Sequence, residues 1–368
     1  MSQIGSLRKD IVEHVRRSCK EEELNPPVPR EYGDIPVSYE AITKEWLTAT
    51  LARDVFRSTI KSFSLGPKDD GSANRRRIEI EWKGFGAHKL PTSVFCKAAH
   101  SAENRIVLAA GGTYSEVCFY NHIRPQLNIE APWAYFAGYD PKSWAAIVIL
   151  KDMGQETTFC NYKTDLTKAQ FAEQVQMLAK LHSQYYQSQH PDFERLLIYK
   201  DRISNLIEVG LETMCVNGFR AAKSSVERNA ELPATVVHGD VHLGNWYITP
   251  DGHMGLTDWQ TVARGHWSRD LAYVLGTAVS VEKRRQWEHE MVEMYVSELR
   301  KHGGPSVSVE EAWLELRRQS LGVLAYWTLT LTPSENLPDM QTEEACLCFI
   351  GRICTMMDDH EVLDAVDF

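Results

Sequence analysis

The hydrophobic pattern changes once along the chain, and this change restricts the possible folds more than any other feature. Between about residues 59 and 150, short apolar runs separated by turn residues predict strands, with one helix near residues 113–123. Beyond residue 153, apolar residues recur at helical spacing, most clearly over residues 166–186. We therefore predict an α+β chain in which a small antiparallel sheet precedes a larger, mostly helical part.

The predicted elements can be given as residue ranges. The strands are expected at residues 60–66, 76–82, 92–99 and 143–150. The helices are expected at residues 7–23, from an N-cap at Ser38 to residue 54, and near residues 200–218, 268–300, 308–330 and 342–357. A short strand-rich island, residues 235–257, interrupts the helical half.

A length of 368 residues exceeds one typical core and suggests two lobes. We predict a helical N-terminal extension over residues 1–54 and a nucleotide-binding lobe over residues 55–150. A C-terminal lobe with the catalytic loop and the substrate pocket is expected over residues 151–368.

The formal charge of −10 opposes binding to nucleic acid or to an anionic membrane. Arg75, Arg76 and Arg77 form a tight basic run, which is typical of a solvated strand face and could also steer phosphates. The start lacks a secretory pattern, the apolar runs are too short to span a bilayer, and eight cysteines are scattered without a disulfide framework. We expect a soluble, cytoplasmic protein of undetermined oligomeric state.

Four residues near the C-terminus invite comparison with a zinc site. Cys346, Cys348, Cys354 and His360 lie close together in sequence, yet Cys346, Ile350, Ile353 and Met357 form a helical apolar stripe. Buried structural cysteines are the prediction, and zinc is the alternative.

The island predicts a β-hairpin with the turn Pro250–Asp251–Gly252. Reflection about the junction of Asp251 and Gly252 places Asn245 opposite Asp258, so that both side chains share one face. An amide oxygen and a carboxylate there, with Asp240 five residues before Asn245, form a hard oxygen site suited to Mg²⁺. The alternative is that these residues only stabilise turns, but their combined spacing is what phosphoryl transfer needs.

These motifs support a family resemblance. "HGDVHLGN" and "LTDW" resemble the catalytic loop and the metal-binding segment of the aminoglycoside phosphotransferase and choline kinase superfamily, which has a bilobal protein-kinase-like fold. The resemblance implies Asp240 as catalytic base, Asn245 and Asp258 as metal ligands, and His238 as a residue that orients the loop. It also implies that Asp270 braces the loop, although a plain helix-terminal carboxylate is an equal alternative.

The same resemblance implies an ATP site in the strand-rich half. Lys97 and Glu116 match an ion pair that holds the nucleotide phosphates, and "VILKDM" resembles the hinge, where backbone groups of Leu150 and Asp152 would meet the adenine. The phosphate-covering loop departs from the family pattern because "SLGPKDDGSANRRRIEI" is poor in glycine. Gly71 with Asn74 is the predicted turn there.

The predicted activity is transfer of the γ-phosphate of Mg·ATP to a hydroxyl group of a small molecule. A catalytically inactive kinase-like binding protein is one alternative. A calcineurin-like metallophosphoesterase is another, because "GDVH" resembles its first motif, although the later motifs of that family are missing.

The acceptor is left open between a sugar, a cationic amine and other alcohols. Trp259, Trp267, Trp313 and Trp327 would suit a cationic amine as an aromatic cage, but tryptophans in a helical half are ordinarily core residues. His242 is expected to pack and not to bind a ligand.

Overall fold

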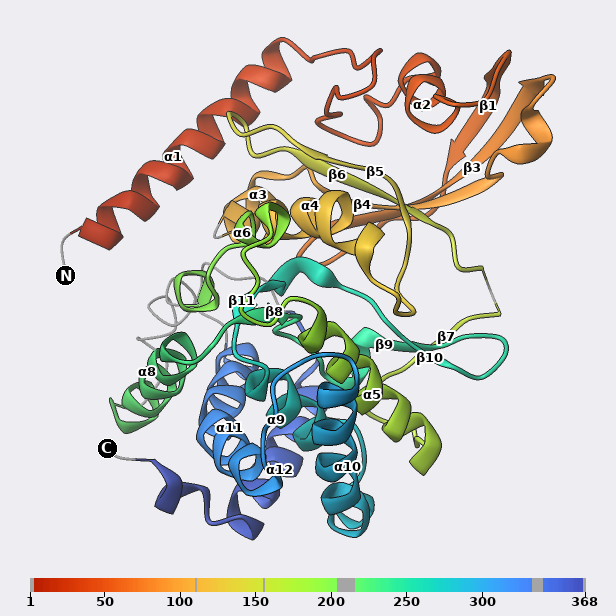
Figure 1. The fold of residues 1–368 in the computed structure, drawn as a ribbon. Coiled ribbons are helices and arrows are strands. Elements are labelled where there is room, and N and C mark those ends of the chain that lie inside the picture. Colours follow the sequence, from red (N-terminus) through yellow and green to blue (C-terminus); the bar gives the residue numbers. More distant parts are fainter. Residues whose placement is uncertain (1–2, 110, 155, 204–215, 333–339, 367–368) are drawn as a thin grey trace. The chain divides into compact units, whose positions relative to one another are not determined.

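The computed structural model describes residues 3–109, 111–154, 156–203, 216–332 and 340–366 (Figure 1). The chain divides into two compact units. Unit 1 comprises residues 1–121 and 132–153, and unit 2 comprises residues 122–131 and 154–368. The predicted α+β class is confirmed, with an antiparallel sheet in unit 1 and mainly helices in unit 2. The functional division among three segments stays a prediction.

Within the described part of unit 1, six antiparallel strands form one sheet in the order β1-β3-β4-β6-β5, with β2 paired to β3. The strands are β1 (Ser58–Leu65), β2 (Asp69–Asp70), β3 (Asn74–Gly84), β4 (Ser93–Ala99), β5 (Ala134–Tyr139) and β6 (Ala146–Lys151). The four predicted strands are present. The sequence pattern missed β2, which has two residues, and β5, whose burial does not alternate.

Alternating side chains explain why this sheet forms. In β3 the apolar residues Ile78 and Ile80 are buried while the intervening Glu79 is exposed. They pack with Val94 and Ile149 in the main apolar cluster of unit 1. Burial of each such side chain contributes about 1.5–3 kcal/mol, so this face fixes the register of the sheet.

Helices of unit 1 flank the sheet (Figure 1). They are α1 (Gln3–Leu24), α2 (Lys44–Leu51), α3 (Ala102–Ala109), α4 (Gly112–Cys118) and a 3₁₀ turn η1 (Ala87–Lys89), and a π-turn η2 (Phe119–Ile123) begins in unit 1 and ends in unit 2. The expected cap at Ser38 is wrong for α2, which starts at Lys44 because the Thr43 hydroxyl accepts from the Trp46 N–H. The Ser38 hydroxyl instead closes a turn by accepting from the Ala41 N–H.

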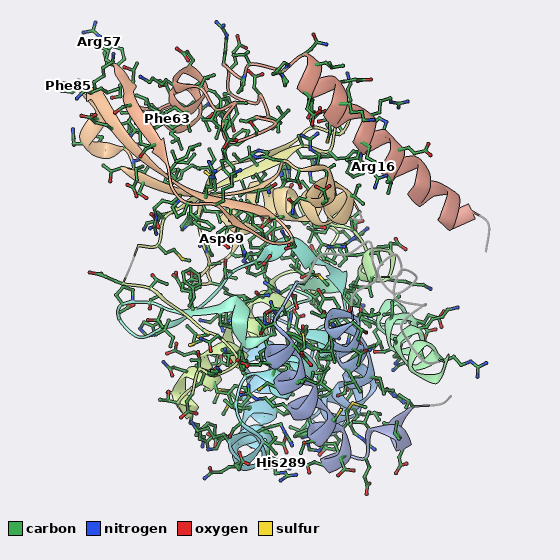
Figure 2. All side chains as sticks on the ribbon, turned by 180° about the vertical axis from the view of Figure 1, so that it is seen from behind. Arg16, Arg57, Phe63, Asp69, Phe85 and His289 are labelled. Atoms are coloured by element: carbon green, nitrogen blue, oxygen red, sulfur yellow. The ribbon has the colours of Figure 1, made fainter. Side chains whose placement is uncertain are left out.

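Exposed side chains lie at the end of the β1–β3 pair where β1 begins and β3 ends. Figure 2 shows Arg57 and Phe85 at this end, where the Phe85 N–H donates to the Arg57 carbonyl. Phe85 is 86% exposed.

Unit 2 is mainly helical in its described part. Its helices are α5 (Lys168–Gln184), α6 (Pro191–Glu194), α8 (Val216–Glu231), α9 (Ser268–Thr277), α10 (Val281–Lys301), α11 (Val309–Leu331) and α12 (Glu343–Asp359), with 3₁₀ turns η3 (Arg124–Gln126), η5 (Leu243–Asn245), η6 (Trp259–Thr261) and η7 (Val362–Ala365). Most of the helix predicted at residues 200–218 lies outside the described residues.

One predicted helix is in fact two. The expectation of a single helix over residues 268–300 is wrong because the chain breaks between α9 and α10, where the Ser280 hydroxyl caps α10 by accepting from the Lys283 N–H. The predictions for α11 and α12 are confirmed within two residues.

Short strands of unit 2 position the catalytic loop. Strand β8 (Thr235–Val237) pairs with β11 (Ala263–Gly265), and β9 (Trp246–Ile248) pairs with both β10 (Met254–Leu256) and β7 (Thr158–Phe159). Strands β7 and β11, of two and three residues, were not predicted.

The tryptophans of unit 2 are mostly core residues, and its C-terminal cysteines differ in burial. Cys346 is buried as predicted and Cys348 is half-buried, but the prediction of a buried cysteine is wrong for Cys354, which is exposed on α12. Trp259, Trp267 and Trp327 are at most 1% exposed, which confirms the core interpretation for these three, while Trp313 is partly buried. Among the described residues, no group of three or more His, Cys, Asp or Glu side chains could hold a metal ion, so the zinc alternative is not supported. The buried stripe of α12 includes Cys346 and Ile353 but has Phe349 and Met356 where Ile350 and Met357 were expected.

Within the part of the chain that the structure describes, none of the helices combines the length and the hydrophobicity that crossing a lipid bilayer requires.

Candidate active site

The hairpin of the island forms, but its loop is one residue shorter than predicted, which changes the pairing of the two strands. Thr249 and His253 close the turn, where Gly252 has φ +90°, and Leu256 pairs with Trp246. Asn245 is therefore opposite Thr257, whose N–H donates to the Asn245 carbonyl at 2.9 Å. The predicted pairing of Asn245 with Asp258 is wrong because a three-residue turn centres the hairpin on Asp251.

Asp258 lies one residue beyond the last pair and has a left-handed backbone, with φ 60° and ψ 66°. Aspartate tolerates this conformation better than most residues, and here it ends the strand and starts the turn η6. The backbone bend, and not strand alternation, therefore sets the direction of the Asp258 side chain. Sequence periodicity has no way to show such a bend.

The predicted base and the first predicted metal ligand are in contact. The Asn245 side-chain amide donates to the Asp240 carbonyl at 2.7 Å and to the carboxylate Oδ2 at 3.2 Å. With its NH₂ group directed at Asp240, Asn245 has its amide oxygen as the group that would ligate a cation. The Asp240 side chain is 17% exposed, so it is accessible to a reacting hydroxyl.

His238 links the catalytic loop to the strand that leads to Asp258. Its Nε2–H donates to the Thr257 carbonyl at 2.9 Å, and its Nδ1 accepts from the Asp240 N–H at 3.2 Å. Burial lowers the pKa of His238, and the nearby carboxylates Asp270 and Asp240 offset this only in part. The neutral ring therefore joins both sides of the site, as expected for a residue that orients the loop.

Asp270, near the start of α9, accepts three hydrogen bonds. The backbone N–H groups of His238 and Gly239 donate to its two oxygens at 2.7 and 2.9 Å, and the His182 Nε2 lies 3.2 Å from Oδ2. Burial alone would raise the pKa of Asp270, but the hydrogen bond and attraction of His182 outweigh it and hold the pKa below its usual value. Of the two interpretations of Asp270, this geometry favours the one in which its carboxylate holds the catalytic loop in place.

The contact between Asp270 and the catalytic loop depends on a glycine at position 239. Gly239 has φ +81°, and a Cβ there would lie 2.9 Å from the Thr261 carbonyl oxygen. The Thr261 hydroxyl also donates to the His238 carbonyl at 2.7 Å. Only glycine combines this positive φ with this close approach.

Two residues of the site were not found from the sequence. The Tyr273 hydroxyl donates to Asp240 Oδ1 at 2.7 Å, and burial together with the charge of Asp240 raises the Tyr273 pKa, which keeps the phenol protonated. His242, expected to pack, does contact the rings of Tyr273, Trp327 and Phe349, but its Nε2 also lies 3.7 Å from Asp240 Oδ2. Tyr273 lies three residues after Asp270, and this helical spacing from the predicted brace was the available signal.

In unit 1, Lys97 and Glu116 form the predicted ion pair. Lys97 Nζ lies 3.1 Å from Glu116 Oε1, and the two side chains are only 8% and 6% exposed. Strand β4 and helix α4 supply them, so two elements separated in sequence fix the position of the ammonium group. A buried, paired lysine is suited to holding a phosphate, because little reorganisation precedes binding.

The two predicted hinge residues differ in their surroundings. Leu150 is inside strand β6 and is paired with Phe95 on one side and with Ala134 on the other. Asp152 lies beyond the strand end, and its carboxylate accepts from Arg77 and from Ser93. A backbone contact to adenine fits Asp152 better than Leu150, because sheet pairing already engages the neighbours of Leu150 on both sides.

The predicted turn at Gly71 and Asn74 is present between β2 and β3. Asn74 Oδ1 accepts from the backbone N–H groups of His100 and Ser101 at 2.9 and 3.3 Å, and Asn104 donates to the Gly71 carbonyl at 2.7 Å. The Asn74 side chain thus ties the turn to the start of α3.

The three arginines that follow are each paired with a carboxylate: Arg75 with Asp69, Arg76 with Glu40 and Arg77 with Asp152. The expected solvated face is wrong for Arg76, which is buried because Glu40 compensates its charge. A role of this run in steering phosphates stays a prediction.

Two of the comparisons with known proteins give matches. A model of the phosphotransferase enzyme family matches residues 139–306. No curated protein sequence matches significantly. A proposed aminoglycoside phosphotransferase from Ralstonia eutropha aligns over 88% of this chain and 98% of its own, with 12% identity and a TM-score of 0.51. An ethanolamine kinase from Plasmodium vivax aligns over 96% of each chain, with 11% identity and a TM-score of 0.50.

At such identities the likeness to solved structures establishes the fold alone. The residues of the family match include the catalytic loop and α9, where the predicted motifs lie. The match and the fold together confirm the resemblance to the aminoglycoside phosphotransferase and choline kinase superfamily, whose protein-kinase-like fold this chain has.

Proposed function

We propose that this protein is a small-molecule kinase that transfers the γ-phosphate of Mg·ATP to a hydroxyl group. The observation that carries the proposal is the catalytic loop, in which Asp240 and Asn245 are in contact and Asp258 follows directly after the residue paired with Asn245. Phosphoryl transfer needs a carboxylate near the attacking hydroxyl and two ligands that hold metal on the phosphates. The match to a phosphotransferase family supports the same chemistry.

The residues present fit Mg²⁺ better than a metal held by protein alone. Among the described residues, no cluster of three His, Cys, Asp or Glu side chains could enclose an ion. One carboxylate, Asp258, and one amide oxygen, from Asn245, suit an ion that keeps water and takes further oxygens from phosphates. When bound, the metal nucleotide would supply the phosphoryl group and neutralise its developing charge.

The residues of the site would then have separate roles. Asp240 would orient the acceptor hydroxyl and accept its proton, while Tyr273 and Asn245 hold the two carboxylate oxygens in place. His238 and Asp270 would keep the loop in position without touching the substrate. In unit 1, the ammonium group of Lys97, fixed by Glu116, would bind the nucleotide phosphates.

A two-metal phosphoesterase would need clusters of histidine and aspartate around each ion. The described part of the chain offers no such cluster, so the geometry favours the kinase over this alternative. A kinase-like binding protein without activity would show ATP binding but no turnover.

The test measures ADP release from Mg·ATP across a library of hydroxylated compounds, together with the shift in melting temperature on adding Mg·ATP. We expect a Mg²⁺-dependent shift and acceptor-dependent ADP release. Asp258→Asn, which tolerates the left-handed backbone, should raise the Mg²⁺ concentration for half-maximal activity about tenfold or more. Asp358→Asn, an exposed exchange of the same chemistry on α12, is the matched control and should change nothing. Full turnover without divalent metal would contradict the proposal.

A further inference from the structure

Two highly exposed phenylalanines lie at the end of the unit 1 sheet where β1 begins and β3 ends. Phe85 is 86% exposed and Phe56 is 74% exposed, and no other large apolar side chain of the described residues is as exposed as Phe85. A single exposed apolar residue needs no explanation, but two at one end of a sheet form a candidate interaction surface. We call this end, residues 53–57 and 83–89, the sheet tip.

Backbone contacts hold the two segments of the sheet tip together. The Phe85 N–H donates to the Arg57 carbonyl at 3.2 Å, and the Gly86 N–H donates to the Ser58 hydroxyl at 3.1 Å. A Cβ at Gly84 would lie 1.9 Å from the Arg57 carbonyl oxygen, so only glycine allows this close approach. Figure 2 shows Arg57 and Phe85 together at this end of the sheet. The two phenylalanines therefore belong to one fixed surface and not to two independent loops.

The backbone of the sheet tip is strained next to Phe56. Arg57 has φ 53°, a left-handed value that is uncommon for a residue with a side chain. Such a conformation is unfavourable by itself and persists only where the surrounding structure imposes it. The Arg57 Cζ lies 4.8 Å from the centre of the Phe56 ring, so a cation and an exposed ring lie at the same point of the surface. Strained backbone beside exposed apolar side chains is typical of a binding surface.

The charge of the sheet tip is opposite to that of the whole chain. Its charged side chains are four basic ones and one acidic one, all exposed: Arg53, Arg57, Lys83 and Lys89, with Asp54. The next charged pair along the strands, Lys61 and Glu81, forms an ion pair at 2.5 Å and adds no net charge. Salt at physiological ionic strength screens charges beyond about 8 Å. A ligand at the tip therefore meets the local excess of positive charge, although the formal charge of the chain is −10.

The size and chemistry of the sheet tip favour a lipid surface over a protein partner. Burial of two phenylalanines removes about 300–500 Å² from water, which is below the roughly 800 Å² per partner of a stable protein interface. A bilayer interface, by contrast, accepts single aromatic side chains at the boundary between headgroups and acyl chains. Anionic headgroups attract each nearby lysine or arginine. The rings and the cations of the tip match the apolar and the charged layer of such a surface.

We propose that the sheet tip attaches this protein reversibly to an anionic phospholipid bilayer. Phe56 and Phe85 insert at the headgroup boundary, and the four basic side chains bind the anionic headgroups. The attachment is an exception to the repulsion expected from the net charge, because the excess of positive charge is local. It needs no helix that crosses the bilayer, and it is independent of the proposed kinase activity.

The test measures binding of the full chain to vesicles by co-sedimentation. Vesicles of phosphatidylcholine with about 30% phosphatidylserine are compared with vesicles of phosphatidylcholine alone, and both are measured at about 0.1 M and 0.5 M KCl. We expect half of the protein to bind the anionic vesicles at a lipid concentration on the order of 0.1–1 mM in the lower salt. The neutral vesicles and the higher salt should each raise this concentration about tenfold or more.

Two double variants separate the contribution of the rings from that of the charges. Phe56→Ser with Phe85→Ser removes both rings, and Lys83→Gln with Lys89→Gln removes two positive charges. Each double variant should raise the lipid concentration for half binding about tenfold or more. All four positions are exposed, so the melting temperatures should equal that of the wild type within about 1 °C.

Matched controls place the same substitutions outside the sheet tip. Phe159→Ser replaces a phenylalanine of β7 that is 52% exposed, and Lys180→Gln with Lys200→Gln removes two exposed lysines of unit 2. These controls should bind the vesicles as the wild type does. An equal loss of binding in the controls and in the tip variants would show that binding follows the surface as a whole, which would overturn the proposal.

Two further results would overturn it. One is a wild type that does not bind the anionic vesicles, or that binds them equally well without Phe56 and Phe85. The other concerns a second copy of this chain as the occupant of the tip, which sedimentation velocity without lipid detects. A dimer that dissociates when both phenylalanines are replaced would assign the tip to self-association. Neither measurement uses ATP or an acceptor, so failure of the proposed kinase function would leave both results unchanged.

Discussion

Two polar loops of this chain are fixed by different chemistry. The catalytic loop in unit 2, residues 238–245, is fixed by the fully buried carboxylate of Asp270, which accepts from two backbone N–H groups and from His182. The turn between β2 and β3 in unit 1 is fixed by two neutral amides, the half-buried Asn74 and the buried Asn104.

The difference shows where a loop tolerates change. A buried charge that accepts several hydrogen bonds leaves uncompensated donors when it is removed, whereas the hydrogen bonds of a half-buried neutral amide such as Asn74 can be partly replaced by water. We therefore expect the catalytic loop to be sensitive to single substitutions at its support and the β2–β3 turn to be tolerant. The sequence patterns agree, since the first loop has a recognisable motif and the second departs from its family pattern.

The largest effect is expected for Asp270→Asn. The new amide has one acceptor where two backbone N–H groups and His182 converge, so its NH₂ group must face a donor. We expect the free energy of unfolding to fall by about 3–5 kcal/mol, measured by urea denaturation, and ADP release to fall with it. Asp358→Asn, an exposed aspartate on α12, is the control and should cost less than about 0.5 kcal/mol. Equal losses in the free energy of unfolding for Asp270→Asn and Asp358→Asn would contradict the claim that the catalytic loop depends on the Asp270 carboxylate.

A smaller effect is expected in the acid dependence of stability, through His238. Its pKa is lowered in the folded state, so as pH falls below about 6.5 the unfolded chain binds the proton first and stability is lost. This loss continues until pH reaches the folded pKa. His238→Asn should therefore flatten the dependence of the unfolding free energy on pH between about 6.5 and 5, by up to about 1.4 kcal/mol per pH unit.

The measurement is urea denaturation of both proteins at several pH values. If the unfolding free energies of the wild type and His238→Asn had the same dependence on pH, His238 would be protonated in the folded state. Its ring would then not be the neutral link between Asp240 and Thr257.

The smallest effect is expected in unit 1, for Asn74→Ala. This change removes the acceptor for the His100 and Ser101 N–H groups, which water can partly replace. We expect a loss of about 1–2 kcal/mol in the free energy of unfolding, and Asn74→Asp, which keeps the acceptor oxygen, should recover most of it. A loss as large as that of Asp270→Asn would show that the β2–β3 turn is no more tolerant than the catalytic loop.

The sequence was sufficient for the fold class and for the principal polar contacts. Strands β3 and β4, the ion pair Lys97–Glu116 and the placement of Asp270 follow from periodicity or from motif order. The hairpin register was not predictable, because a turn of three residues and one of four have the same sequence signature. The bend at Asp258 and the contact of Tyr273 with Asp240 depend on tertiary packing, which no local pattern encodes.

The central claim is that Asp240 accepts the proton of an acceptor hydroxyl, and Asp240→Asn tests it most directly. Asparagine still accepts from Tyr273 and has nearly the same shape. Its NH₂ group replaces the oxygen that accepts from Asn245 at 3.2 Å, but the Asn245 amide keeps its 2.7 Å hydrogen bond to the backbone carbonyl of residue 240, so the fold and the Mg·ATP-induced melting shift should persist. We predict that acceptor-dependent ADP release, measured under saturating Mg·ATP, falls by a factor on the order of 10² to 10⁴. Turnover equal to that of the wild type would contradict the account.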